Sequence, residues 1–312
     1  MHKFILRRLA MLIPVILGVS FIVFSIMDLT PGDPVEMYLG DNYTDEAHAA
    51  MTKELGLDKP FIVRYLNYIG NAIQGDFGIS YSTHQPVLDE ILARFPNTLV
   101  LAIAALIFAI VVGIILGTIS AAKQNSIFDS TSTFTALIGV SMPNFWFGLM
   151  LIIIFAAGLG WFPSSEFSGV KSMVLPAIAL GTNSLAIITR MTRSSLLETI
   201  RQDYVRTARA KGLKEYKVII KHALRNAMIP IITISGLQFG FLISGAVVIE
   251  TVFSWPGIGR LLVEAIQLKD TPIVLSLVLI KAAMFTVINL GTDIMYAFFD
   301  PRIRAQYKAK RV

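Results

Sequence analysis

Residues 98–121, TLVLAIAALIFAIVVGIILGTISA, contain neither a charged side chain nor a proline. At about 1.5 Å per residue, a helix of this length extends roughly 36 Å and exceeds the roughly 30 Å hydrocarbon core of a bilayer. Inside lipid every backbone amide must be paired within the segment, which favours a helix over a strand. The stretch therefore predicts a transmembrane helix.

The rest of the chain has the same character. Of 312 residues, 54% are hydrophobic and only 15% are charged, and the mean hydropathy is +0.66. This leaves too little polar side chain to cover a soluble globule. We therefore expect an all-α polytopic membrane protein with six transmembrane helices, at about 9–27, 98–121, 134–157, 174–190, 229–249 and 273–298. The fourth has a polar centre, Gly181 to Ser184, which is typical of a helix that faces a cavity.

The distribution of basic residues predicts the orientation. With the N-terminus inside, the cytoplasmic segments hold 19 of the 27 Lys and Arg residues and the outside segments hold 7. Cytoplasmic loops retain positive charge, so both termini are expected in the cytoplasm. The predicted organisation is an N-terminal region with the first transmembrane helix (1–27), an extracytoplasmic insertion (28–97) and a core membrane domain (98–312) that includes a cytoplasmic hairpin (191–228).

The insertion 28–97 is acidic, with eleven Asp or Glu against four basic residues. Asp58-Lys59-Pro60 predicts the start of a helix that ends at Gly75. A second short helix is expected near Pro86, with apolar residues on one side: Val87, Leu88, Ile91, Leu92 and Phe95. Two interpretations stay open, a cap lying on the transmembrane helices and the membrane interface, or a docking platform for an extracytoplasmic partner.

A basic block, DYVRTARAKGLKEYKVIIKHALRNAMIP, occupies residues 203–230. Its one glycine, Gly212, predicts two short helices joined at that residue, because glycine enters positive φ without steric cost. In the second helix one face is expected to be basic and the other apolar: Lys214, Lys217, Lys221 and Arg225 against Ile219, Ile220, Ala223 and Ala227. The positive charge is what the positive-inside rule predicts for any cytoplasmic loop. An amphipathic helix of this kind is also suited to lying on anionic lipid headgroups, packing under the chain's own transmembrane helices or seating in a groove on a partner.

Several classes of function are disfavoured. The chain has no cysteine, and its four histidines lie outside the predicted spans, so no catalytic, metal or cofactor site is expected and an intramembrane enzyme is improbable. No G-x-x-x-x-G-K-[ST] phosphate loop is present, so this chain is not expected to hydrolyse ATP. A nucleic-acid partner is improbable in a membrane setting. A secondary transporter is also disfavoured, because no inverted repeat and few buried carboxylates for ion coupling are detectable.

Several motifs in order resemble one family. They are ILRRLAMLIPVILGVSFIVFSIMDLTPGDP, ELGLDKPFIVRYLNYI, GDFGIS, RFPNTLVLA, MPNFWFGLMLI, VLPAIALG, DYVRTARAKGL, HALRNAMIP, ETVFSWPGIGRLLVEAI and DPRIR. The chain is similar throughout to permease subunits of bacterial ATP-binding-cassette (ABC) importers, specifically the B-type member of the peptide/nickel branch. The general superfamily pattern Glu-Ala-Ala before the glycine is Arg206-Thr207-Ala208 here, so its acidic residue has no counterpart.

The resemblance implies a type I ABC importer permease fold in the bacterial cytoplasmic (inner) membrane, surrounded by membrane lipids. It implies a homologous C-type permease subunit, two cytoplasmic ATPase subunits that carry ATP and Mg, and an extracytoplasmic substrate-binding protein. The substrate is expected to be a di- or oligopeptide, with glutathione or a nickel or metal chelate as the alternative. The residues implied to couple ATPase motion to transport are Asp203, Tyr204, Arg206, Thr207, Ala208, Arg209, Ala210, Lys211, Gly212 and Leu213.

Polar residues inside the predicted spans are candidates for the transport pathway, since unpaired polar groups are costly in lipid. The candidates are Asn144, Asn183, Ser184, Gln238, Ser244 and Glu250. An interhelical hydrogen bond is the alternative role for each of them.

Overall fold

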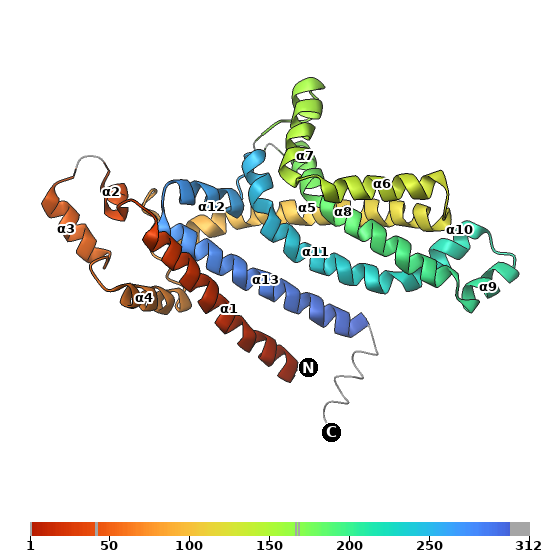
Figure 1. The fold of residues 1–312 in the computed structure, drawn as a ribbon, viewed down its shortest axis with the longest axis horizontal. Coiled ribbons are helices and arrows are strands. Elements are labelled where there is room, and N and C mark those ends of the chain that lie inside the picture. The colour runs from red at the N-terminus through yellow and green to blue at the C-terminus, as the bar shows by residue number, and fades with distance from the viewer. Residues whose placement is uncertain (1, 41–42, 166, 168, 300–312) are drawn as a thin grey trace. The chain divides into compact units, whose positions relative to one another are not determined.

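The computed structural model describes residues 2–40, 43–165, 167 and 169–299 (Figure 1). These residues form helices and no β-strand, with one isolated bridge between Ile79 and Pro86. The all-α prediction is therefore confirmed. The helices are α1 (His2–Leu29), α2 (Pro34–Leu39), α3 (Asp45–Glu54), α4 (Phe61–Ile73), α5 (Val87–Ala122), α6 (Ile127–Ser141), α7 (Asn144–Leu151), the π-helix η1 (Ile152–Gly158), α8 (Val170–Ile200), α9 (Asp203–Ala210), α10 (Glu215–Lys217), the π-helix η2 (Val218–Leu224), α11 (Arg225–Val252), α12 (Ile258–Gln267) and α13 (Thr271–Phe299).

Six apolar helical segments match the six predicted spans. Four are long enough to cross a membrane, Val87–Ala122, Val170–Ile200, Glu215–Val252 and Thr271–Thr292, and two are shorter, Ile13–Leu29 and Asn144–Gly158. The window of Val170–Ile200 is 67% buried, more than the other three, as its polar centre predicts. The basic residues of 300–312 lie outside the described residues.

The third predicted span, 134–157, is interrupted at Pro143. Helix α6 ends at Ser141, Met142 is extended with ψ 134°, and α7 begins at Asn144. A proline disfavours the helical conformation of the residue before it and donates no backbone hydrogen bond. Pro143 therefore separates α6 from α7, and the apolar segment that follows continues through η1.

Residues 1–98 and 256–286 form one compact unit. Its core joins the start of α5 to α12 and α13 through buried Val87, Ile91, Ile258 and Leu277. Asp270, which is fully buried, precedes α13 and accepts hydrogen bonds from Ser80 Oγ (2.6 Å), Ser82 N (3.0 Å) and Ser82 Oγ (2.9 Å). This carboxylate therefore ties the turn at residues 80–82 to the start of α13.

Two local predictions in this unit need correction. Helix α4 has Pro60, not Asp58, at its N-cap position, without a side-chain cap. The second short helix near Pro86 is the beginning of the 36-residue helix α5, which runs through Pro96. Val87 and Ile91 are buried there, but Leu92 is 56% exposed, because the buried side of this segment is the narrow one that faces α12 and α13. Gly75 follows the end of α4 with φ +84°, as predicted.

Among the described residues, 99–255 and 287–299 form the second compact unit. Here α8 packs closely against α5 and α11. A Cβ added at Gly117 of α5 would lie 2.6 Å from the carbonyl oxygen of Thr189, and one added at Gly181 of α8 would lie 2.7 Å from that of Ala105. Both distances are far below van der Waals contact, so glycine at these positions permits the close approach of the two helices.

Candidate coupling hairpin and pathway residues

The turn between α9 and α10 has the conformation that the sequence predicts. Gly212 has φ +75°, and a Cβ built there meets nothing within 4 Å. Its amide donates to the carbonyl oxygen of Arg209 at 2.9 Å, and the amide of Lys211 donates to that of Thr207 at 3.1 Å. Space is available for a side chain, so the requirement for glycine comes from the left-handed backbone alone.

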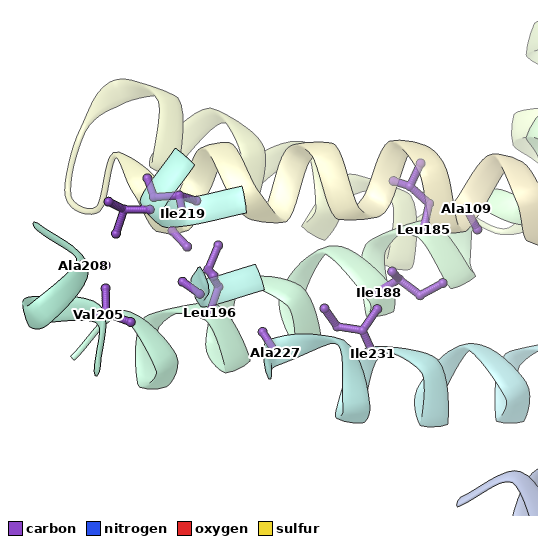
Figure 2. Packing of buried hydrophobic residues seen from close by; sticks show 12 residues of the cluster. Ala109, Leu185, Ile188, Leu196, Val205, Ala208, Ile219, Ala227 and Ile231 are labelled. Atoms are coloured by element: carbon purple, nitrogen blue, oxygen red, sulfur yellow. The ribbon is translucent and has the colours of Figure 1, made fainter. Parts of the chain in front are cut away.

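The inner face of the hairpin is apolar and buried. Val205 of α9 is fully buried, Ala208 is 6% exposed, and Val218 is fully buried. They belong to a cluster that also contains Leu196 of α8 and Ala227 of α11, so the hairpin rests on the helices from which it emerges (Figure 2). The hairpin is therefore packed directly against α8 and α11.

The outer face of the hairpin is exposed and mixed in character. Of the ten residues expected to couple, all but Ala208 are exposed: Asp203, Tyr204, Arg206, Thr207, Arg209, Ala210, Lys211, Gly212 and Leu213. Ala208 belongs instead to the buried cluster. Two further apolar side chains, Tyr216 and Ile220, are 58% and 59% exposed. The outer apolar face is thus Tyr204, Leu213, Tyr216 and Ile220.

The π-helix η2 explains why Ile220 was assigned to the wrong face. An ordinary α-helix places Ile219, Ile220 and Ala223 on one side, and the expected apolar face rests on that geometry. In η2 the backbone bonds connect residues five apart, which changes the side-chain register. Ile219 and Ala223 are buried, but Ile220 points outward. Only the periodicity of an α-helix was available in the sequence, and it does not reveal a π-helix.

An ion pair joins the two arms of the hairpin. The guanidinium of Arg209 donates to Glu215 from Nη2 to Oε1 at 2.7 Å and from Nε to Oε2 at 3.1 Å. This hydrogen bonding by Arg209 lowers the pKa of the Glu215 carboxyl, opposing the effect of burial. The pair lies beside Gly212 and fixes the spacing between α9 and α10.

A second ion pair, which the sequence pattern did not reveal, lies near the C-terminal end of α8. Arg193 donates from Nε to Asp129 Oδ1 and from Nη2 to Asp129 Oδ2, both at 2.8 Å. The Asp129 side chain is 7% exposed and that of Arg193 is 31% exposed. Ser120 Oγ and the backbone amide of Asn125 also donate to this carboxylate. Arg193 in particular holds the pKa of the Asp129 carboxyl well below its usual range, against the effect of burial.

The structure brings two of the six candidate pathway residues together. Ser184 of α8 donates to Gln238 Oε1 of α11 at 2.9 Å, and both are buried. The other four are dispersed: Asn144 is the first residue of α7, Asn183 is half-buried, Ser244 is exposed and Glu250 is fully buried. The Ser184–Gln238 contact is the interhelical hydrogen bond that the sequence analysis offered as the alternative to substrate contact.

We expect Ser184→Ala to lower stability modestly and to leave the KM for uptake unchanged. Interhelical hydrogen bonds in membranes contribute about 0.6 kcal/mol on average, with a maximum near 1.7 kcal/mol. Thermal unfolding and uptake kinetics of the assembled transporter measure the two effects, with Ser244→Ala as the exposed control. A raised KM at unchanged stability would instead place Ser184 on the pathway.

Comparison with family models agrees with this arrangement. Residues 109–305 match the model described as the binding-protein-dependent transport system inner membrane component, and residues 1–102 match its N-terminal companion. The chain belongs to this family. It is a multi-pass inner-membrane permease of the ABC importer class, so the predictions of family, fold and membrane location are confirmed.

Relatives of known annotation align with this permease over nearly its whole length. A di/tripeptide transport system permease protein from Pseudomonas aeruginosa (strain UCBPP-PA14) is 45% identical over 98% of this chain and 100% of its own length. A glutathione transport system permease protein from Escherichia coli O1:K1 / APEC is 41% identical over 97% of this chain and 99% of its own length. These relatives are transport subunits, and the prediction that this subunit is not an enzyme is confirmed by them.

A solved structure supports the fold of the permease. The methionine ABC transporter in inward-facing conformations aligns with a TM-score of 0.54 at 17% identity, covering 67% of this chain and 96% of that chain. At this identity the similarity concerns the fold alone, and it agrees with the type I permease fold expected from the sequence.

Proposed function

We propose that this permease forms half of a transmembrane pathway for di- or oligopeptides, and that its hairpin 191–228 couples the pathway to ATP hydrolysis on partner subunits. The observation that carries the coupling role is the division of the hairpin into two faces. Its inner face is buried against α8 and α11, and its outer face exposes Tyr204, Leu213 and Tyr216. A rigid element with one anchored face and one free apolar face is suited to docking in a groove of another subunit.

The proposed assembly contains a homologous C-type permease, two cytoplasmic ATPase subunits that bind ATP and Mg, and an extracytoplasmic substrate-binding protein. Both termini and the hairpin lie in the cytoplasm, and the insertion 28–97 lies outside, as the distribution of basic residues indicates. When the ATPases close on nucleotide, they displace the docked hairpins. Helices α8 and α11 move with the hairpin because they share its buried cluster, and the pathway changes the side to which it opens.

The names of the relatives support a peptide substrate. A di/tripeptide permease is 45% identical, and the glutathione permease at 41% transports a compound that is itself a tripeptide derivative. Glutathione is therefore the second candidate, and a metal chelate is the third. A backbone with free termini is the chemistry that these peptide candidates share.

Uptake by the complete transporter tests this function. The permease is reconstituted in liposomes with the partner permease, the ATPase subunits and the substrate-binding protein of the proposed assembly. Labelled dipeptide, tripeptide, glutathione and nickel chelate are then supplied in separate assays. We expect ATP-dependent uptake of the peptides. Uptake that persists when the ATPases cannot hydrolyse ATP would contradict coupling, and ATP-dependent uptake of only the chelate would contradict the peptide assignment.

The outer apolar face gives a direct test of docking. We expect Tyr216→Ala to weaken ATPase binding by about 1 kcal/mol, or roughly fivefold, because exposed aromatic side chains often become buried anchors in interfaces. Binding of the purified ATPase to the permease pair in nanodiscs measures this affinity. Ile73→Ala, which removes an exposed apolar side chain from α4, is the matched control. Equal affinities for the Tyr216→Ala variant and the unaltered protein would exclude Tyr216 from the interface.

A further inference from the structure

Helix α4 of the insertion packs across the first transmembrane helix. Its aromatic residues Phe61 and Tyr65 make edge contacts with Phe21 of α1, with ring centroids 5.7 and 5.3 Å apart, and with Phe24 at 5.3 and 5.6 Å. Tyr68 also contacts Phe24 at 6.2 Å. These aromatic contacts hold about two turns of α4 against α1.

The contact lies within the membrane-spanning part of α1. Phe21 and Phe24 precede Met27, the end of the predicted first span, by three to six residues, or about 5–9 Å along the helix axis. The hydroxyl of Tyr65 reaches deeper, donating to the carbonyl oxygen of Leu17 at 2.9 Å and lying 2.9 Å from Ser20 Oγ. The phenol is thereby satisfied at a depth where water is scarce.

One exposed stripe of α4 is apolar. Ile62, Leu66 and Ile73 are 54%, 60% and 81% exposed, and at about 100° per residue they fall within roughly 40° of one another around the helix. The polar residues Asn67 and Asn71 point away from them, with Asn71 on the opposite side. Three isoleucine and leucine side chains in one stripe are costly to leave in water.

The single charged residue of α4 is held toward the membrane surface. Arg64 Nη2 lies 2.5 Å from Asp28 Oδ1 at the outer end of α1. Long basic side chains commonly extend toward the interface in this way while their stems remain in apolar surroundings. No other charge in α4 opposes contact with acyl chains.

We propose that α4 is an interfacial helix whose stripe Ile62, Leu66 and Ile73 is inserted among the acyl chains of the extracytoplasmic leaflet. The depth of the α1 contact matches the 5–10 Å or so at which amphipathic helices lie in an interface. The insertion is then anchored by lipid at its middle, and a binding protein docks on the remaining surface. The choice of the extracytoplasmic leaflet depends on the proposed topology. The burial of the stripe in lipid depends only on the contact between α4 and α1.

The absence of cysteine allows a clean test. Single-cysteine variants Ile62→Cys, Leu66→Cys and Ile73→Cys are spin-labelled in the assembled transporter, in nanodiscs of phosphatidylethanolamine and phosphatidylglycerol. Asn71→Cys on the opposite side of the same helix is the matched control. Collision rates with oxygen, which concentrates in lipid, and with a neutral nickel complex, which stays in water, are then measured.

The expected result is an oxygen-to-nickel ratio several-fold higher at the three stripe positions than at Asn71. A stripe that collides mainly with the nickel complex lies in water and overturns the proposal. A stripe that is immobile and reached by neither reagent is covered by a protein subunit, which also overturns it. Because three positions are labelled independently, the test remains decisive if one variant fails to assemble. The spin-label experiment needs no transport measurement, so its outcome is separate from that of the uptake assay.

Discussion

Replacing Arg193 by methionine is expected to destabilise the permease more than any other single surface substitution near the hairpin. The change leaves the carboxylate of Asp129, whose side chain is 7% exposed, without its positive partner. Removing one partner of a buried ion pair lowers the free energy of unfolding by about 3–5 kcal/mol. We expect about 3 kcal/mol, the lower end of that range, because Ser120 and Asn125 still donate to the carboxylate and Arg193 is partly solvated.

Thermal unfolding of the purified transporter measures this effect. At roughly 2–4 °C per kcal/mol for a chain of this size, the apparent Tm should fall by about 6–12 °C. Arg206→Met is the matched control, because Arg206 lies 3.8 Å from Asp203 in a pair whose side chains are 74% and 98% exposed. Such pairs contribute almost nothing to stability.

The double variant Asp129→Leu with Arg193→Met separates charge from packing. Removing both partners of a buried pair is often neutral, so this variant should regain much of the stability lost in Arg193→Met. If the double variant is as unstable as the single one, packing by the Arg193 side chain is responsible and the ion-pair explanation is wrong.

The lowered pKa of Asp129 also predicts the pH dependence of stability. A carboxyl with a folded-state pKa below its unfolded value stabilises the fold above the unfolded pKa, near 4, and loses that contribution as the pH falls through the folded pKa. The contribution of Asp129 should therefore be constant between about pH 5 and pH 8.

The helices of this permease were largely predictable, and the reasons are local. Six stretches rich in apolar residues predicted six apolar segments, and Gly212 predicted the left-handed turn. Pro143 indicated a kink in the third span, but local sequence indicated neither the full break between α6 and α7 nor the continuity of α5 through Pro96. A proline breaks one helix and is accommodated in another according to the packing around it, so its sequence position alone does not decide the outcome.

Long-range pairings were beyond the reach of sequence patterns. Asp129 and Arg193 are 64 residues apart, and in the sequence each merely contributed to the charge on one side of the membrane. Ser184 and Gln238 were both predicted as candidates, but their mutual hydrogen bond became visible only when α8 and α11 were placed together. The predicted coupling residues end at Leu213, and the exposure of Tyr216 became visible only in the folded hairpin.

The second large effect is expected from Gly212→Val in the coupling hairpin. Gly212 has φ +75°, where a β-branched residue is a conformational outlier. Holding a non-glycine residue in such a region costs about 1–3 kcal/mol, which reduces the population of the native turn roughly 5- to 150-fold relative to alternatives. Membrane insertion should be intact, because the turn lies outside every predicted span. Substrate-stimulated ATP hydrolysis and uptake by the assembled transporter should fall by a similar factor.

Gly212→Asn is the decisive companion variant, because asparagine adopts the left-handed conformation far more readily than valine. A Cβ at this position meets no atom within 4 Å, so a clash does not explain any difference between the two variants. We expect uptake by Gly212→Asn to remain close to that of the unaltered protein while Gly212→Val fails at equal abundance. Equal loss in both variants would mean that the ATPase requires a bare backbone at this position. Normal uptake by both would remove the hairpin turn from the coupling mechanism.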